Sequence, residues 1–379
     1  MSTAVAAPKP IVVKEMVSIN VATPITADTK MLVVGSSIVL LNESSVRAIG
    51  VDGVEKWRLA LTQGVASVAT ALAADSTGNI WVAGMSANAR VVTPPATPPI
   101  PPINPDNVLV DPKVPVRADL TIATIWKISS TGSLLSTFTF DNASALLINA
   151  IALNARGFSI GGTNVTDTGN SGVIISGDLE GKFGKPIYLG KSDTNIDALV
   201  RAADSSIYAI GSSTEVLAGK KLAGSRDGII ARYSSTGKLV ALIRSSAVKA
   251  KREWNSATNT LFLAGSVQTG QKFESALTKF AANVSPTWTF RFASTGPTFA
   301  SIGPAGSHFA AFASKSAIRA IPSWKPTKPS ALVLTFDRRG AITDARTVDG
   351  VPLALGYSRD LGAVLLSSNQ TGVSIFRVS

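Results

Sequence analysis

The sequence predicts an all-β protein made of short, repeated sheets, and three observations support this prediction. Short apolar runs that alternate with small or polar residues recur along the 379 residues. Glycines at positions 161, 211 and 265 give a repeat of about 50 residues, the length of a four-stranded propeller blade. The 31 Gly and 20 Pro, with only 16% charged residues, suit many strands joined by turns. Since one such sheet cannot bury both of its faces alone, we expect a single seven-bladed β-propeller of four-stranded antiparallel blades.

The clearest repeat runs from 206 to 244. An apolar run at 206–213 is followed by an irregular segment and by a second run at 227–244, which the residues Ser235-Thr236-Gly237 interrupt. This pattern predicts three short antiparallel strands, the last two joined by a tight turn at Thr236 and Gly237.

Six other repeats show parts of the same pattern. The first contains the hairpin signal Asp52-Gly53, and the second is interrupted by an insertion at 87–117 with a stiff polyproline run. In order, the seven repeats are expected at about 31–62, 66–135, 155–181, 206–244, 260–291, 308–342 and 363–378. A count of six or eight blades would move only one boundary.

The seventh repeat ends one strand short. We expect the alternating segment 11–22 to add its outermost strand, which closes the ring without an exposed edge. The propeller domain then spans 10–379. Residues 1–9, with the triplet Ala4-Val5-Ala6, are interpreted either as a signal-peptide remnant or as a disordered leader. The first interpretation predicts an extracytoplasmic location (periplasm, cell surface or medium), and a cytoplasmic location stays open.

The fourth repeat also carries a family resemblance. Its sequence, 206–212 followed by Asp227-Gly228 and the turn at Gly237, is similar to bacterial β-propeller repeats of the SBBP type. The first repeat, through 46–57, resembles a quinoprotein-type propeller blade. Both resemblances imply an architecture only, because both repeat families serve binding proteins as well as enzymes.

Composition limits the classes of partner. The net charge of +12 and the pI near 10 favour polyanions such as an acidic polysaccharide or an envelope polymer, with a protein as the alternative. Basic residues are scattered and aromatic residues make up 6%, which argues against specific nucleic-acid binding.

The absence of cysteine excludes disulfides and thiolate metal sites. No apolar run is long enough to predict a transmembrane segment, and we expect a monomer.

Two sets of residues are candidates for a binding site. Loops between the second and third strands of a blade emerge on one face, and four of these loops are elaborated. Their cationic residues, with one tryptophan as a stacking platform, predict a ligand-binding face composed of Lys220, Lys221, Lys272, Trp324, Lys325 and Lys328. The alternative is that these loops are merely tolerated and that Trp324 anchors its own loop.

The second set consists of charges in strands expected to line the central channel. Its members are Asp197, Arg201, Lys249, Lys251, Arg252 and Glu253. The alternative is a water-filled channel whose charges pair across blades.

Catalytic signals are weak. His308 is the only histidine and opens an apolar strand, so a Ser-His-Asp triad or a multi-histidine metal site has little to build on. We therefore expect a non-catalytic binding module without a cofactor or metal. Two alternatives stay open: a lyase or hydrolase of acidic sugars that uses Arg201, Lys249 and Lys251, and a structural scaffold of an envelope or appendage.

Overall fold

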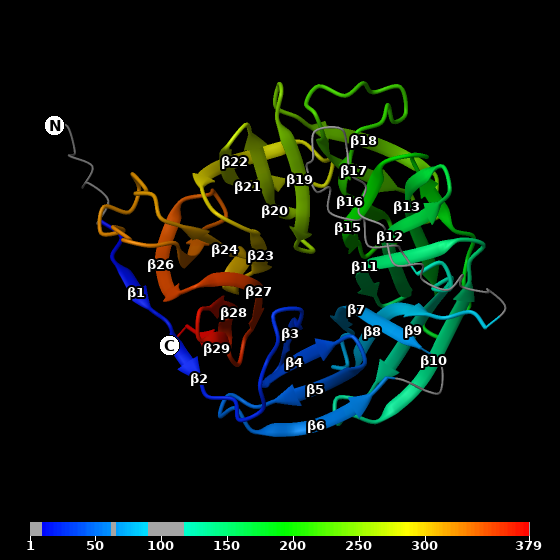
Figure 1. Cartoon of the computed structure of the whole chain (residues 1–379), viewed down its shortest axis with the longest axis horizontal. Helices are drawn as coiled ribbons and strands as arrows, with labels where there is room; N and C mark the ends of the chain where they lie inside the picture. Colours follow the sequence, from blue (N-terminus) through cyan, green and yellow to red (C-terminus); the bar gives the residue numbers. More distant parts are fainter. Residues whose placement is uncertain (1–9, 62–65, 90–116, 379) are drawn as a thin grey trace, which may run out of the picture.

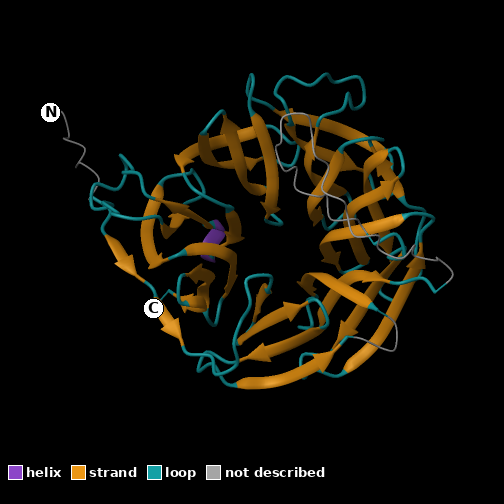
Figure 2. Ribbon diagram, viewed as in Figure 1, coloured by secondary structure: helices purple, strands orange, loops and turns teal. Residues whose placement is uncertain are grey.

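Seven sheets, six of four strands and one of five, form a closed ring (Figure 1). The computed structural model describes residues 10–61, 66–89 and 117–378. Within these residues strands and connecting loops account for nearly all of the chain, and one short 3-10 helix, η1 (Pro304–Gly306), is present (Figure 2). The predicted fold class, a seven-bladed β-propeller, is confirmed. The leader 1–9 and most of the predicted insertion 87–117 lie outside the described residues.

Each blade runs from an innermost strand at the central axis to an outermost strand at the rim. Blade one contains β3 (Lys30–Val34), β4 (Ser37–Asn42), β5 (Ser45–Ile49) and β6 (Glu55–Ala60). Blade two contains β7 (Ser67–Ala74), β8 (Ile80–Ser86), β9 (Ile122–Ile128) and β10 (Leu134–Asp141). Blade three contains β11 (Ala145–Asn154), β12 (Gly157–Thr166), β13 (Gly169–Gly177) and β14 (Ile187–Leu189). Blade four contains β15 (Thr194–Arg201), β16 (Ile207–Ser213), β17 (Asp227–Tyr233) and β18 (Leu239–Ser245).

The remaining blades follow the same order. Blade five contains β19 (Lys251–Ala257), β20 (Phe262–Thr269), β21 (Lys272–Phe280) and β22 (Pro286–Ala293). Blade six contains β23 (Phe299–Ile302), β24 (His308–Ser314), β25 (Ser330–Phe336) and β26 (Ile342–Asp349). Blade seven contains β27 (Val351–Ser358), β28 (Gly362–Asn369) and β29 (Gly372–Arg377). Its fourth strand comes from the other end of the chain.

The N-terminal segment closes the ring, but it divides between two blades. β2 (Val17–Ile19) pairs antiparallel with β29 and supplies the outermost strand of blade seven, as predicted. β1 (Val13–Glu15) instead pairs in parallel with β26 of blade six. The chain crosses from one blade to the next at Met16, whose side chain is buried in the cluster of apolar residues between them. The expectation of one strand over 11–22 was therefore wrong, because neighbouring blades turn about the ring axis and one straight strand cannot follow both edges.

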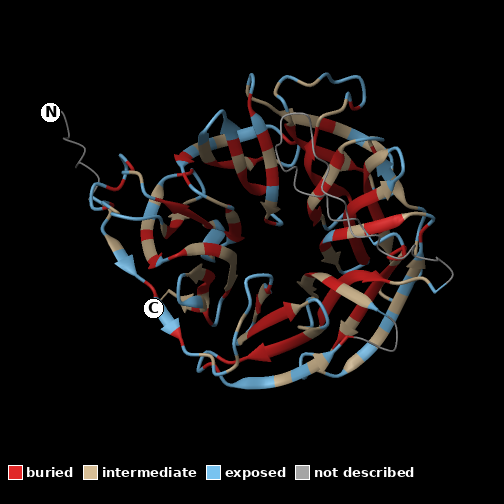
Figure 3. Ribbon diagram, viewed as in Figure 1, coloured by how far each residue is buried: buried red, intermediate tan, exposed pale blue. Residues whose placement is uncertain are grey.

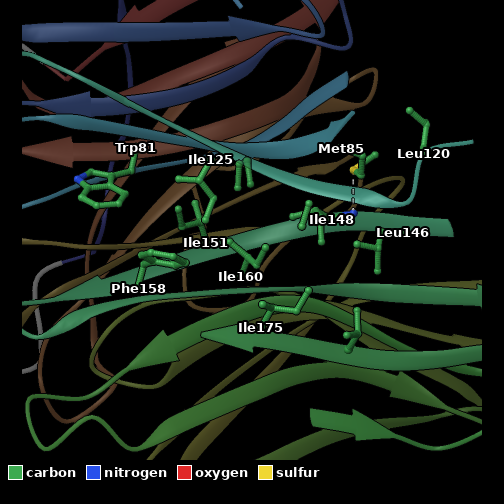
Figure 4. Close-up of a cluster of buried hydrophobic side chains, with 14 residues drawn as sticks. Trp81, Met85, Leu120, Ile125, Leu146, Ile148, Ile151, Phe158, Ile160 and Ile175 are labelled. Carbon is green, nitrogen blue, oxygen red and sulfur yellow. Dashed lines mark hydrogen bonds between the residues drawn. The ribbon is translucent and has the colours of Figure 1, made fainter. Parts of the chain in front are cut away.

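The core consists of apolar layers between adjacent blades. Burial is concentrated in the inner and middle strands, whereas the outermost strands are largely exposed (Figure 3). Between blades two and three, Trp81 and Ile125 pack against Phe158 and Ile160 (Figure 4). The backbone amide of Ile148 donates to Met85 Sδ at 3.2 Å across the same layer. Each blade thus buries its faces only against its neighbours, as expected for a repeat fold.

A bulge in the innermost strand explains the glycine repeat. The pairing of innermost and second strands shifts by one residue in blades two to five, at Thr70, Asn149, Asp197 and Asn255. A glycine of the second strand lies opposite each bulge, at Gly84, Gly162, Gly211 and Gly265. A Cβ on Gly211 would lie 2.0 Å from the carbonyl oxygen of Asn195, and the other three meet a backbone oxygen just as closely. Only glycine fits there. In blade three the equivalent residue is Gly162, one position after the glycine on which the predicted repeat was based.

Candidate functional site

The connections on the two faces of the ring differ in length. Second-to-third strand connections and blade-to-blade connections share one face, which we call the loop-rich face. It carries the connections 214–226 of blade four and 315–329 of blade six. The opposite face carries short turns such as 234–238, except for the longer β13–β14 connection at 178–186.

The lysines predicted for the loop-rich face are exposed. Lys220, Lys221 and Lys325 form no ion pair with the described part of the chain. In contrast, Lys272 Nζ lies 2.9 Å from Glu274, and Lys328 Nζ lies 2.8 Å from Asp349. Three of the five lysines are therefore exposed without an acidic partner in the described part of the chain.

Trp324 does not form the predicted stacking platform. Its side chain is only 4% exposed and packs in the core cluster with Ile318 and Ile321. The backbone of 318–324 makes two successive tight turns, with the Ile321 amide bonded to Ile318 and the Trp324 amide bonded to Ile321. These turns direct all three side chains inward. Trp324 anchors its own loop, as in the alternative interpretation.

Two acidic side chains of the loop-rich face, Asp193 and Glu215, are already engaged. The carboxylate of Asp193 accepts hydrogen bonds from Arg226 at 2.5 Å. Glu215 accepts the backbone amides of Lys191 and Asp193 and the hydroxyl of Thr194. Burial alone would raise the pKa of Glu215, but these bonds lower it below its ordinary value. The carboxylates therefore hold the loops in place and leave the exposed lysines without partners.

The central channel opens into a cavity of about 540 Å³ that the innermost strands of all seven blades line. Of the six predicted channel residues, Asp197 alone lines it. Burial, with a further contribution from Glu253, raises the pKa of Asp197 to about 6. Asn149 Nδ2 lies 3.4 Å from the Asp197 carboxylate. The channel thus contains one carboxylate that burial makes hard to ionise.

The other five predicted channel residues lie elsewhere. Arg252 is buried and stacks on the ring of Trp254, 4.4 Å from its centroid. Burial lowers the pKa of Arg252 to about 10. Lys251 pairs with Glu253 at 3.1 Å, and Lys249 is exposed in the β18–β19 connection.

Arg201 ends β15 and lines a different cavity, between blades three and four. These residues were assigned to the channel because they are charged and lie in or beside strands whose side chains should alternate between the two faces. The bulges at Asp197 and Asn255 shift that alternation, and the sequence signal for each bulge is the glycine opposite it.

His308 is a packing residue. It is 3% exposed and lies against Phe262, with the two ring centroids 4.9 Å apart. Its Nε2 lies 3.0 Å from Thr260 Oγ1. Burial, aided by the charge of Lys279, lowers the pKa of His308 to about 4, so the imidazole is neutral at pH 7. Among the described residues, no group of three or more His, Cys, Asp or Glu side chains could hold a metal ion.

The fold and its ring closure define the class of the protein: it is a seven-bladed β-propeller. A solved structure described as BBS1N in complex with ARL6DN is similar at 10% identity, with a TM-score of 0.54 and 98% of each chain covered. The Pan2 WD40 domain of Neurospora crassa is similar at 10% identity and a TM-score of 0.51, over 94% of this chain and 89% of that one. BamB from Moraxella catarrhalis matches at 10% identity and a TM-score of 0.46, over 94% and 98%.

Identities this low show the fold alone. No protein-family model and no curated protein matches the sequence. The described part of the chain also contains no helix that is long and apolar enough to cross a membrane.

Proposed function

We propose that this propeller is a non-catalytic binding module that recognises a polyanionic polymer through its loop-rich face. One observation carries the proposal: Lys220, Lys221 and Lys325 are exposed and unpaired within the described chain, while the nearby carboxylates Asp193 and Glu215 are engaged. We call these three lysines the lysine face. Because they lie on blades four and six, with Lys272 on blade five between them, a chain of repeating anionic groups suits their spread better than a small ligand does.

Acidic polysaccharides and envelope polymers have this chemistry, which agrees with the extracytoplasmic location predicted from the sequence. A protein partner with an acidic surface is the second candidate, because one similar propeller structure contains a bound protein. The enzyme alternative loses support, since Arg201 does not share a cavity with Lys249 and Lys251.

The test is retention of the full chain on immobilised polygalacturonate, with neutral dextran as the uncharged comparison. The variant Lys220→Glu, Lys221→Glu, Lys325→Glu should weaken retention at low salt by about tenfold or more, and its dependence on salt should become shallower. The matched control carries Lys238→Glu, Arg339→Glu and Arg359→Glu, exposed positions in turns of the opposite face with the same change in net charge. It should retain most of the binding. Equal losses in both variants would show that net charge alone drives retention. Unchanged retention of the Lys220→Glu, Lys221→Glu, Lys325→Glu variant would show that the lysine face is not the binding surface.

A further inference from the structure

A second cavity lies on the opposite face, between blades three and four, and has a volume of about 560 Å³. Its walls come from the end of β13 and the β13–β14 connection at 178–186 in blade three, and from the end of β15 and the β17–β18 turn at 234–238 in blade four. The volume is within the range of small-molecule sites. None of the residues of the lysine face lines it. It is therefore independent of the proposed polymer-binding surface.

Arg201 lies in the wall of this cavity and is held by neutral acceptors. Its Nε donates to Asn154 Oδ1 at 3.1 Å, and its Nη1 donates to the carbonyl of Phe158 at 3.2 Å and to Ser159 Oγ at 2.7 Å. Burial lowers the pKa of Arg201 below its ordinary value, and no carboxylate of the described chain pairs with it. Its Nη2 has no acceptor among the described residues. A fixed, partly desolvated guanidinium without a counter-ion is a strong donor for an anion, because less rotamer freedom is lost on binding.

Three more basic side chains surround the same space. Arg156, Lys182 and Lys185 are exposed at its rim. The only carboxylate in its lining is that of Asp178, whose Oδ1 already accepts the backbone amides of Glu180 and Lys182. The lining therefore contains four cationic side chains and one carboxylate, and that carboxylate is already engaged in closing a turn. This excess of positive charge complements a dianion better than a monoanion.

The remaining lining indicates what the anion is attached to. Ser235 and Thr236 add hydroxyl groups, and Pro186, Ile187 and Ile207 add a small apolar patch. No aromatic side chain lines the cavity, so a nucleobase would have nothing on which to stack. A phosphate alone would fill only part of the volume. A sugar matches the polar and apolar mixture.

We propose that the cavity between blades three and four binds a phosphorylated sugar, with Arg201 as the central phosphate ligand and Arg156, Lys182 and Lys185 around it. In this arrangement the Arg201 guanidinium contacts the phosphate through its free Nη2 edge. The rim cations supply charge attraction. The hydroxyls of Ser235 and Thr236 contact the sugar.

Isothermal titration calorimetry of the full chain tests the proposal with four probes: glucose 6-phosphate, inorganic phosphate, glucose and glucuronate. Glucose 6-phosphate should bind with a Kd of about 10 µM to 1 mM. Inorganic phosphate and glucuronate should bind at least about tenfold more weakly, and glucose should not bind. If glucose 6-phosphate shows no heat of binding, or if inorganic phosphate or glucuronate binds equally well, the proposal is overturned.

Variants then locate the site. Arg201→Met should weaken glucose 6-phosphate binding by about tenfold or more. Because Arg201 also bonds to blade three, a second variant at exposed positions, Lys182→Ala with Lys185→Ala, avoids a loss of folding and should weaken binding by about three- to tenfold. The lysine-face variant should bind glucose 6-phosphate normally, which separates this site from the polymer-binding proposal. Normal binding by Lys182→Ala/Lys185→Ala and by a folded Arg201→Met would place the ligand elsewhere and overturn the assignment.

Discussion

Arg244 Nε lies 2.9 Å from the carboxylate of Asp227, and the two side chains are only 6% and 0% exposed. Asp227 also accepts the backbone amides of Ala223 and Gly224. Arg244 donates to the carbonyls of Glu215, at 2.7 Å, and of Lys220. Burial alone would raise the pKa of Asp227, but these hydrogen bonds lower it below its ordinary value. One buried ion pair therefore holds the long connection that presents Lys220 and Lys221.

Removal of this carboxylate should destabilise the protein strongly. Asp227→Ala leaves the Arg244 guanidinium buried without a counter-ion, and we expect a loss of about 3–5 kcal/mol in the free energy of unfolding. The measurement is urea denaturation at pH 7. The control is Asp349→Ala, which breaks the exposed pair with Lys328 and should cost less than about 1 kcal/mol. A comparable, small loss in both variants would mean that the buried pair does not anchor the loop.

The glycine opposite each bulge is a second structural requirement. In Gly211→Ala, the new Cβ would lie 2.0 Å from the carbonyl oxygen of Asn195, so the backbone of blade four must move. We expect a loss of about 2 kcal/mol or more, measured by urea or thermal denaturation. Gly184→Ala is the control, because its Cβ would meet only the Ser176 carbonyl oxygen at 3.7 Å. If Gly211→Ala proves as stable as Gly184→Ala, the bulge does not explain the glycine repeat.

Signals that act over a few residues were enough to predict the blades. The turn at Thr236 and Gly237 joins β17 and β18, and Gly237 has a φ of +81° that favours glycine. The glycine spacing predicted the length of the repeat because the bulged innermost strands of blades two to five each face a glycine. Both signals arise from backbone contacts between strands that follow each other in the chain. The residue pattern alone is therefore enough to detect them.

The candidate sites depended on contacts that the sequence does not encode locally. Trp324 is buried because its loop turns back onto blade six, and nothing in 321–329 distinguishes that path from an exposed one. Arg252 was assigned to the channel as a charged residue of an innermost strand, but it stacks on Trp254. Arg201 joins Arg156, Lys182 and Lys185 only when blades three and four pack together. These residues come from three separate segments, the β11–β12 turn, the β13–β14 connection and the end of β15, so no spacing rule could have grouped them.

Burial of His308 should make the protein sensitive to acid. The pKa of the imidazole is about 4 in the folded state and 6.5 in its ordinary state, so protonation favours unfolding. The contribution of His308 to the free energy of unfolding is constant above about pH 7. It falls by up to about 3 kcal/mol as the pH decreases from 6.5 toward 4. In His308→Gln, which keeps a polar group near Thr260 but does not titrate, this decrease should disappear. The free energies of unfolding at pH 7 and pH 4.5 give the comparison, and an equal decrease in both proteins would contradict the assignment.

Asp197 departs from a hydrogen-bonding pattern around the channel. At the bulges of the neighbouring blades, Thr70 Oγ1 donates to the Ile148 carbonyl at 2.5 Å and Asn149 Nδ2 donates to the Ile196 carbonyl at 3.2 Å. Asn255, with its amide nitrogen toward Thr298, donates to that carbonyl at 3.1 Å. These three bulge residues thus bond to the backbone of the next blade. An ionised Asp197 has no proton to donate, although it occupies the equivalent position in blade four.

Replacing this carboxylate with an amide should therefore stabilise the ring. Burial and Glu253 raise the pKa of Asp197 to about 6, against the opposing effect of Arg226, so ionisation at pH 7 opposes folding. We expect Asp197→Asn to gain about 1–2 kcal/mol at pH 7, less than the ~3 kcal/mol that the pKa difference implies, because the carboxylate is partly exposed to the channel. The gain should shrink as the pH falls through 6 toward 4, where the wild-type carboxyl becomes protonated and able to donate. Thermal denaturation of both proteins across this range is the measurement. A gain in the free energy of unfolding that stays constant with pH would show that packing causes the effect. A loss at pH 7 would show that the charge of Asp197 itself stabilises the channel.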